Sequence, residues 1–353
     1  MSQFELLPST RYLGSKRKLL PALQAVLSSV SFESAADPFC GSGAVAYLLK
    51  TMNKHVLASD VLNWNVICTS ALLGEPDFGF LPALEKVLVE IENIAFEHHA
   101  AAPGFIECHF EGLFYTSDEN RFMDRYISAV ADWSVQRRQF ALHVLFQAAL
   151  AKRPYNLFHR ANLYMRQQQV QRSFGNKTTW DTPFNVLVRR YAEELCTAWF
   201  GSSRKVSVCQ RDVNDADFTG VDLVYLDPPY MPKKGMGVDY LDYYHLLEGI
   251  ALDDNALWRQ KLLHRYKHKP LAGRGENPFC SATRITGAFE SVIEKCADAT
   301  IVLSYRSDGI PDVATLVAML RHIGKRVTVV DCGKYIYALS RNAKSREVIL
   351  VAE

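Results

Sequence analysis

The residues best suited to chemistry are Asp227-Pro228-Pro229-Tyr230, which follow a short apolar run, Leu223–Leu226. The run has no polar break, as is typical of a strand buried on both faces. Two prolines end such a strand, because proline cannot donate a hydrogen bond to a sheet and fixes its own φ. In open α/β sheets, ligands bind at the carboxyl ends of the strands. The pattern predicts a stiff loop that presents a carboxylate, a carbonyl and an aromatic ring.

These three groups match a planar exocyclic amine. The Asp227 carboxylate and the Pro228 carbonyl can each accept one N–H hydrogen bond, which returns electron density to the nitrogen and makes it a better nucleophile. The ring of Tyr230 can stack on a flat base. A strand that simply ends in a turn is the alternative interpretation, and this motif by itself does not decide between the two.

A second motif, Asp37-Pro38-Phe39-Cys40-Gly41-Ser42-Gly43, lies between a short strand of small residues and a helix-like run over 44–50. Its glycines let the backbone approach a ligand closely, and the helix start offers free N–H groups. The motif is neither a dinucleotide-binding turn nor a triphosphate cradle. Because an acid precedes the turn, a cationic group is favoured over a phosphate. S-adenosylmethionine has an amino group, a sulfonium and no phosphate.

Further strands place two more acids. Asp60 ends the strand predicted over 55–60 and is a candidate to hold both ribose hydroxyls of the cofactor, with a helix N-cap as its alternative role. Asp212 ends the strand predicted over 205–212 and is a candidate contact to the cofactor adenine. Strands are also predicted over 300–305, 326–331 and 348–352. The last two are joined by a connection too short for a crossover helix, which predicts that they pair antiparallel. The expected fold is a Rossmann-like, doubly wound α/β sheet of seven strands, mostly parallel, with an antiparallel terminal hairpin.

Two segments are basic and contain no acid. The first, 152–177, is rich in Asn and Gln and carries the cations Lys152, Arg153, Arg160, Arg166, Arg172 and Lys177. Because arginine contacts phosphates and amides pair with adenine, and because two cofactor-type motifs flank the segment, we expect it to bind nucleic acid rather than form a solvated face. The second, 259–274, includes Arg265, Lys267 and Lys269 and suits a loop over a bound strand as well as it suits a solvated loop.

The composition limits the class of protein. The chain has 353 residues, is 48% hydrophobic and has a net charge of +2, which excludes a histone-like or acidic-tail protein. Its eight cysteines form no Cys-x-x-Cys pair and have no His at zinc-ligand spacing, so we expect no structural metal and reduced thiols. The amino terminus has no signal-like apolar region, and no apolar run is long enough for a membrane span. We therefore expect a cytoplasmic protein without a membrane partner.

Three motifs in this order, 11–16, 37–43 and 227–230, resemble the D12 class of N6-adenine DNA methyltransferases, the alpha group that includes Dam-like enzymes. The resemblance implies S-adenosyl-L-methionine held by Tyr12, Gly14, Lys16, Asp37, Pro38, Phe39, Gly41, Gly43, Asp60 and Asp212. It also implies a flipped adenine at Asp227, Pro228, Pro229 and Tyr230. The expected division is a catalytic domain of residues 1–75 and 200–353 with a mostly helical recognition insert, 76–199. Residues 172–177 match the family's usual insert pattern only loosely, which leaves the recognised sequence open.

The expected activity is methyl transfer from S-adenosylmethionine to N6 of an adenine extruded from duplex DNA, as in a modification methylase. A cognate restriction endonuclease that acts separately is a compatible partner. Three alternatives stay open: methylation of cytosine N4, a structured RNA substrate, and a non-catalytic DNA-binding protein that senses the cofactor. The acid at the head of the 227–230 motif resembles adenine enzymes more than cytosine enzymes, which more often have serine there. The intact motif argues against a non-catalytic protein.

Overall fold

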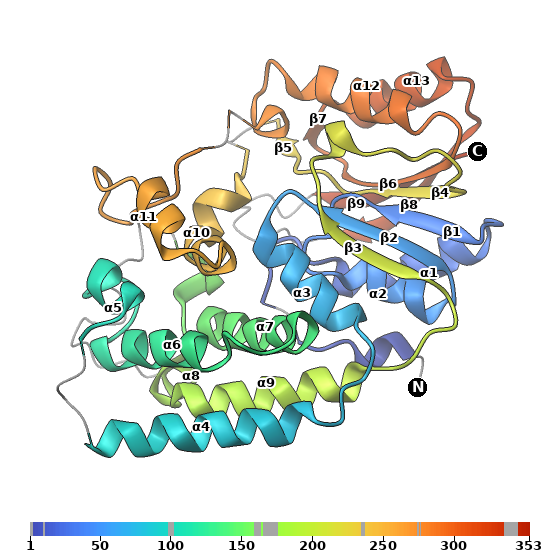
Figure 1. Ribbon diagram of the computed structural model, residues 1–353. Helices are drawn as coiled ribbons and strands as arrows, with labels where there is room; N and C mark the ends of the chain where they lie inside the picture. Colours follow the sequence, from blue (N-terminus) through green and yellow to red (C-terminus); the bar gives the residue numbers. More distant parts are fainter. Residues whose placement is uncertain are drawn as a thin grey trace.

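The computed structural model describes residues 3–9, 11–97, 102–158, 164, 176–233, 237–273, 275, 277–334 and 345–353. Its centre is a seven-stranded sheet (Figure 1). The strands lie in the order β3 (Val206–Gln210), β2 (His55–Asp60), β1 (Ser34–Asp37), β4 (Leu223–Leu226), β6 (Thr300–Arg306), β9 (Arg346–Ala352) and β8 (Val327–Lys334). Only β9 runs against its neighbours, pairing antiparallel with both β6 and β8. The predicted fold class and the antiparallel pairing of the last two strands are confirmed.

The central strands, β1 and β4, are short and buried, as their small and apolar residues predict. Their register is fixed at the amino end, where the Asp222 carboxylate accepts hydrogen bonds from the N–H groups of Glu33 (2.9 Å) and Ser34 (2.8 Å). The strand order reverses between β1 and β4, so their carboxyl ends diverge and leave room for a ligand. This is the edge at which both chemical motifs end their strands.

Helices cover both faces of the sheet (Figure 1). One face carries α1 (Leu20–Ser28), α2 (Ala44–Thr51) and α3 (Asn63–Leu73). The other carries α12 (Ile285–Lys295) and α13 (Val313–His322). Short 3₁₀ turns join or precede several elements: η1 (Gln3–Leu6), η2 (Lys16–Leu19), η3 (Pro154–Asn156), η5 (Val213–Asp215) and η6 (Pro278–Cys280).

Further helices extend the first layer away from the sheet. They are α4 (Phe80–Glu97), α5 (Phe105–Phe110), α6 (Ser117–Ala129), α7 (Val135–Ala151), α8 (Asn176–Asp181) and α9 (Phe184–Ala198). Two later helices, α10 (Tyr240–Ala251) and α11 (Asn255–Lys261), lie on the same side of the molecule. Trp258 of α11 packs on Phe105 and Phe110 of α5, with ring centroids 4.6 and 5.7 Å apart. The helical layer is thus built from both the 76–199 segment and residues after β4.

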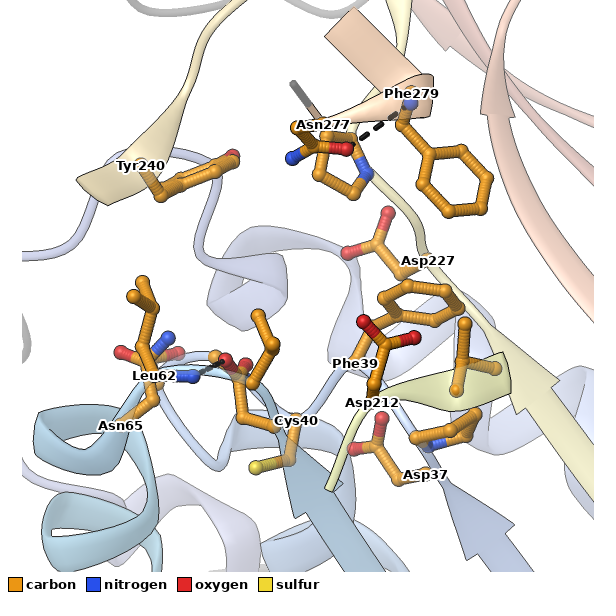
Figure 2. A pocket seen from close by; sticks show the side chains of 18 of the residues that line it. Asp37, Phe39, Cys40, Leu62, Asn65, Asp212, Asp227, Tyr240, Asn277 and Phe279 are labelled. Atoms are coloured by element: carbon orange, nitrogen blue, oxygen red, sulfur yellow. Dashed lines mark hydrogen bonds between the residues drawn. The ribbon is translucent and has the colours of Figure 1, made fainter. Parts of the chain in front are cut away.

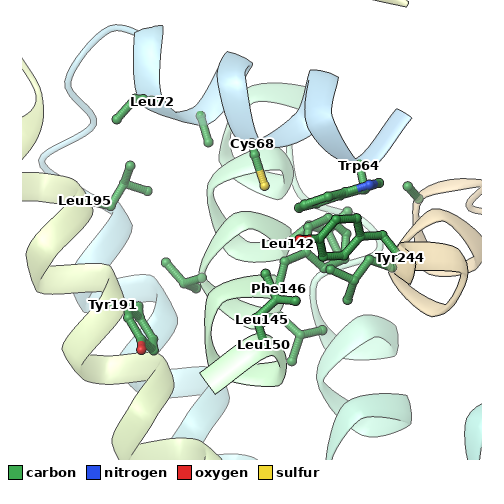
Figure 3. Packing of buried hydrophobic residues seen from close by; sticks show 14 of the residues in the cluster. Trp64, Cys68, Leu72, Leu142, Leu145, Phe146, Leu150, Tyr191, Leu195 and Tyr244 are labelled. Atoms are coloured by element: carbon green, nitrogen blue, oxygen red, sulfur yellow. The ribbon is translucent and has the colours of Figure 1, made fainter. Parts of the chain in front are cut away.

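The helical layer and the sheet share one hydrophobic core. Figure 3 shows Trp64, Cys68 and Leu72 of α3 facing Leu142 and Phe146 of α7. On the far side of α7, the same cluster continues into α9. Because α3 also covers the sheet, the buried surface is continuous from strand to outermost helix.

Two local features differ from expectation. The sequence of residues 121–150 predicts one helical stretch, whereas the structure has two helices there, since the chain breaks after α6 and Ser134 caps α7 by accepting a hydrogen bond from the Arg137 N–H. A two-stranded ribbon, β5 (Met231–Pro232) with β7 (Gly309–Ile310), was not predicted. Each strand of the ribbon has only two residues, too few for a sequence period to appear.

Candidate active site at the carboxyl edge of the sheet

A cavity of about 490 Å³ opens at the carboxyl ends of β1, β2 and β4 (Figure 2). Nine of the ten residues expected to hold the cofactor line it: Tyr12, Gly14, Lys16, Asp37, Pro38, Phe39, Gly41, Asp60 and Asp212. Asp227 and Pro229 of the predicted catalytic loop line the same cavity. Gly43, Pro228 and Tyr230 are not among its lining residues. The two motifs that are far apart in sequence therefore share one space.

The glycine turn is shaped by backbone conformations that side chains disfavour. Gly41 has φ +49° and Gly43 has φ +74°, both in the left-handed region. A Cβ atom at Gly41 would lie 3.1 Å from the Tyr12 ring, so glycine lets that ring close the cavity from above the turn. Gly43 serves as the N-cap of α2, which explains its importance although it does not line the cavity.

Asp60 braces the turn. Its carboxylate accepts hydrogen bonds from the N–H groups of Gly41 (3.0 Å) and Leu62 (2.9 Å). It does not cap α3. That role falls to Glu248 of α10, whose carboxylate accepts from the N–H groups of Asn63 and Trp64 at 3.1 Å each.

Asp37 is the most deeply buried acid of the cavity. Its carboxylate accepts hydrogen bonds from the backbone of Phe39 and Ala46, yet its Oδ1 has no hydrogen-bond partner among the described residues. Burial raises the pKa of Asp37 well above its ordinary value, and the nearby carboxylates of Asp227 and Asp60 raise it further. Such a group favours a cation as its ligand.

Figure 2 shows the carboxylates of Asp37, Asp212 and Asp227 gathered on one side of the cavity, with Tyr240 across from them. Asp212 follows β3 and accepts hydrogen bonds from the N–H and side-chain amide of Asn214, both at 2.9 Å. Among the described residues, the cavity is lined by five acids and two cations. The acids are Asp37, Asp60, Asp212, Asp227 and Asp239, and the cations are Lys16 and Arg211.

Several lining residues were not found from the sequence. Tyr240 of α10 stacks on Tyr12 with centroids 5.5 Å apart and planes at 8°. Residues 277–279 form the opposite rim, where Phe279 meets Phe39 edge-on at 5.6 Å. The sequence Asn277-Pro278-Phe279 does indicate a turn, because an Asn-Pro pair favours turn initiation. Only the fold shows that this turn reaches the glycine motif.

The catalytic loop is anchored on both sides. Asp227, whose side chain is 15% exposed, has the ammonium of Lys16 2.7 Å from its Oδ1. Burial raises the pKa of Asp227, and Lys16 lowers it, with a net shift upward. Beyond the loop, the β5–β7 ribbon continues into a hydrogen bond from the Lys233 N–H to the Asp308 carbonyl at 3.0 Å. Lys16, expected to hold the cofactor, thus lines the cavity and pairs with Asp227.

Tyr230 packs against the sheet rather than lining the cavity. Its ring meets Tyr305 of β6 in a T-shaped contact, with centroids 5.7 Å apart at 75°. The Lys16 ammonium lies 5.4 Å from the ring centroid, and the Arg306 guanidinium lies 5.8 Å from it. The ring is therefore held in place by two cations and an aromatic edge.

Two residues expected to bind DNA are buried instead. Lys152 is 1% exposed; its ammonium lies 2.9 Å from a Glu119 carboxylate oxygen and donates to the Trp180 and Thr182 carbonyls. Arg153 is 2% exposed and donates to the Phe114 carbonyl at 2.7 Å. The expectation was wrong for both, because the last turn of α7 faces the core and its cations satisfy carbonyls there.

The other basic residues are placed as follows. Arg265 and Lys267 are exposed, and Lys269 is half-buried and donates to the His109 carbonyl. The backbone of Lys177 belongs to α8. Arg160, Arg166 and Arg172 lie outside the described residues.

Three further features bear on other kinds of site. All eight cysteines are free thiols. Within the described ranges, no group of three or more metal-ligating side chains occurs. No helix in that part of the chain is long and apolar enough to cross a bilayer.

Comparison with known proteins bears on the identity of the site. Residues 12–283 match the model of the D12 class N6 adenine-specific DNA methyltransferase family. The chain is 22% identical to the Type II methyltransferase M2.HphI of Haemophilus parahaemolyticus, over 98% of each chain. It is 28% identical to the Type II methyltransferase M.NlaIII of Neisseria lactamica, over 89% of this chain and 88% of that one.

A solved structure, the rRNA methyltransferase aviRa from Streptomyces viridochromogenes, aligns with 99% of this chain and 89% of its own at a TM-score of 0.33 and 15% identity. The family match spans the glycine turn, the catalytic loop and the cavity between them, and its description agrees with the adenine prediction rather than the cytosine alternative. The chain belongs to the D12 class of N6 adenine-specific DNA methyltransferases, enzymes that methylate adenine N6 in DNA.

Proposed function

We propose that the cavity binds S-adenosyl-L-methionine and that the loop at Asp227 holds the target adenine beside it. The observation that carries the proposal is the acidic lining around a buried carboxylate oxygen of Asp37 that has no hydrogen-bond partner among the described residues. A methyl donor with an ammonium and a sulfonium places positive charge against this predominantly acidic set of described residues. A phosphate-bearing cofactor would place negative charge against five acids.

Each part of the donor has a matching group. Asp37 and the glycine turn suit the amino acid portion, because the turn lets the backbone approach closely. Asp60, which ends β2, suits the ribose hydroxyls. Asp212 and the aromatic ring of Tyr12 suit the adenine, through a hydrogen bond and a flat apolar surface respectively. These roles are proposals for the residues that line the cavity.

The target adenine must leave the helix to reach the cavity. Asp227 and the Pro228 carbonyl would then accept the two N–H hydrogens of N6 and aim its lone pair at the methyl carbon, so that catalysis comes largely from positioning. The N6–methyl bond forms as the sulfur–methyl bond breaks, and the nitrogen releases one proton afterwards. Asp227 stabilises the positive charge that develops on N6.

We also propose that two exposed cations, Arg265 and Lys267, contact the DNA phosphates. Because phosphate contacts carry little sequence information, the recognised site depends on other residues. The similarity to two Type II methyltransferases supports a role beside a separate restriction endonuclease.

The decisive experiment replaces Asp227 with alanine. We expect Asp227→Ala to abolish tritiated methyl transfer from S-adenosylmethionine to plasmid DNA and to leave cofactor binding, measured by calorimetry, within about threefold of wild type. Asp222→Asn, at the opposite end of β4, is the control and should keep its activity. Transfer at the wild-type rate by Asp227→Ala would refute the assignment. Mass analysis of the methylated nucleosides identifies N6-methyladenine as the expected product.

A further inference from the structure

A buried glutamate lies behind the catalytic loop, on a strand that the family match does not reach. Glu347 belongs to β9 and is fully buried. Its Oε1 is 3.7 Å from the ammonium nitrogen of Lys16. The same ammonium lies 2.7 Å from Asp227. Lys16, itself 5% exposed, is therefore enclosed between two carboxylates that are 120 residues apart in the sequence.

A buried charge at position 347 is unfavourable unless a cation compensates it. The remainder of β9, Val348–Ala352, is apolar and buried, so packing alone would favour an apolar residue at 347. Breaking a buried ion pair is strongly destabilising, whereas apolar replacement of a whole pair is often neutral. The glutamate is thus better explained by its effect on Lys16 than by stability.

The charge balance around Lys16 matters for Asp227. A single lysine paired only with Asp227 would neutralise that carboxylate and compete with the substrate amine for its oxygens. A second anion beside the ammonium offsets, by its own negative charge, part of the positive field that the cation exerts at Asp227. Both anions raise the pKa of Lys16, although burial opposes them, so the lysine stays charged.

The supporting side chains come from the same edge of the sheet. Arg306 of β6 lies beside the Tyr230 ring, and its guanidinium pairs with Asp308 at 2.7 Å. Ser345, just before β9, accepts a hydrogen bond from Arg306 at 3.3 Å. Strands β6 and β9 thus form the surface against which Tyr230 and Lys16 are held.

We propose that Glu347 is a positioning residue for methyl transfer: it holds the Lys16 ammonium beside Asp227 while preventing that ammonium from neutralising the carboxylate. The inference depends on the proposed role of Asp227. It adds a functional residue from the carboxyl-terminal part of the chain, which lies beyond the matched residues 12–283.

The test is the pH profile of Glu347→Gln. Among the described residues, the ionisable groups around Lys16 are Asp227, Glu347, Tyr230, Tyr225 and Tyr240. Those near Asp227 are Lys16, Asp37, Tyr225, Tyr230 and Tyr240. With Glu347 neutral, its charge no longer offsets the positive field of Lys16 at Asp227, and the pKa of Asp227 falls. We expect the acid limb of kcat to move to lower pH and the plateau kcat to fall about tenfold, with KM for S-adenosylmethionine unchanged.

Two further variants test whether the effect of Glu347 on the pH profile depends on Lys16. Lys16→Met removes the cation that lowers the pKa of Asp227, so its acid limb should move the opposite way, to higher pH. In the Lys16→Met background, Glu347→Gln should shift the limb less than it does in wild type, because only the direct repulsion between the two carboxylates is then removed and the position of the ammonium no longer contributes. Arg346→Gln is the matched control: this neighbour on β9 is exposed, pairs with Asp331, and should leave the profile unchanged.

A wild-type acid limb and plateau in Glu347→Gln would overturn the inference. A lower melting temperature with an unmoved pH profile would overturn it too, by assigning Glu347 a structural role. If glutamine impairs folding, Glu347→Met removes the same charge with an apolar side chain of similar length, and the same outcomes apply. Activity in Asp227→Ala would instead refute the proposed role of Asp227, so the two failures are distinguishable.

Discussion

At the scale of single residues, the cavity holds acids that ligand binding explains better than stability does. Asp37 and Asp222 illustrate the contrast, since they flank the same pair of strands, β1 and β4. Burial raises the pKa of Asp37, whereas hydrogen bonds from the backbone of Glu33 and Ser34 lower the pKa of Asp222. One carboxylate therefore destabilises the unliganded protein when ionised, and the other stabilises it.

These opposite shifts predict opposite effects of the same substitution. The raised pKa of Asp37 means that ionisation opposes folding increasingly as pH rises above the ordinary value of 3.8. Asp37→Asn should therefore raise the melting temperature at pH 8, with little change near pH 4, while weakening S-adenosylmethionine binding at least tenfold. Thermal melts across pH and calorimetry measure the two effects.

Asp222→Asn is the matched comparison. The lowered pKa of Asp222 means that its carboxylate stabilises the fold above 3.8 and that this stabilisation is lost as pH falls through the lowered value. The variant should melt below wild type at pH 8 and approach it in acid, with cofactor binding retained. A lower melting temperature for Asp37→Asn than for wild type at pH 8 would contradict the interpretation of Asp37 as a buried carboxylate whose ionisation opposes folding.

At the scale of elements, buried cations join helices that the sequence alone would leave separate. Lys152 ends α7 and donates to the carbonyls of Trp180 and Thr182 around the end of α8. Arg153, next to it, binds the Phe114 carbonyl after α5 and lies over the Phe114 ring at 4.9 Å. Basic composition predicted a DNA contact here, but the helix axis turns both side chains into the protein.

Substitution of Lys152 should separate stability from DNA binding. Lys152→Met leaves the Glu119 carboxylate and two carbonyls without their cation and should lower the free energy of unfolding by about 3–5 kcal/mol. The dependence of DNA affinity on salt should keep its slope. Denaturant unfolding and fluorescence anisotropy at several salt concentrations are the measurements.

The exposed Lys267 is the paired control. Lys267→Met should leave stability unchanged within about 0.5 kcal/mol and reduce the slope of log affinity against log salt by about 1, because one phosphate contact is lost. An unchanged slope for Lys267→Met would remove this residue from the proposed DNA-binding surface.

At the scale of the whole molecule, the helical layer and the sheet are expected to unfold together. Trp64 of α3 meets Phe146 of α7 edge-on, with centroids 6.4 Å apart, and α3 in turn covers the sheet. A core shared in this way predicts one cooperative transition rather than separate melting of a 76–199 domain.

Phe146→Ala tests this expectation. Loss of a buried phenyl ring should cost about 3–5 kcal/mol and move the single transition as a unit, with far-UV circular dichroism and tryptophan fluorescence still coincident. Val135→Ala, on the same helix but 77% exposed, should have little effect. Two resolved transitions in either variant would show that the insert is an independent domain.

The sequence by itself determined where the strands lie and which turns follow them. The strand His55–Asp60 and the apolar run Leu223–Leu226 match the structure residue for residue, because a buried strand ended by an acid, glycine or proline is a local pattern. The glycine turn and the catalytic loop were recognisable for the same reason, and their strands' carboxyl ends had to meet at one edge of a parallel sheet.

Only the tertiary structure decided the partners of the charged residues. The sequence predicted a cofactor role for Lys16 but not its contacts with Asp227 and Glu347, and it did not predict that Lys152 and Arg153 turn inward. No local sequence pattern specifies the partners of a charged side chain, because its electrostatic environment depends on which distant elements pack around it. A charge looks the same in sequence whether it faces water, DNA or a carboxylate brought from the far end of the chain.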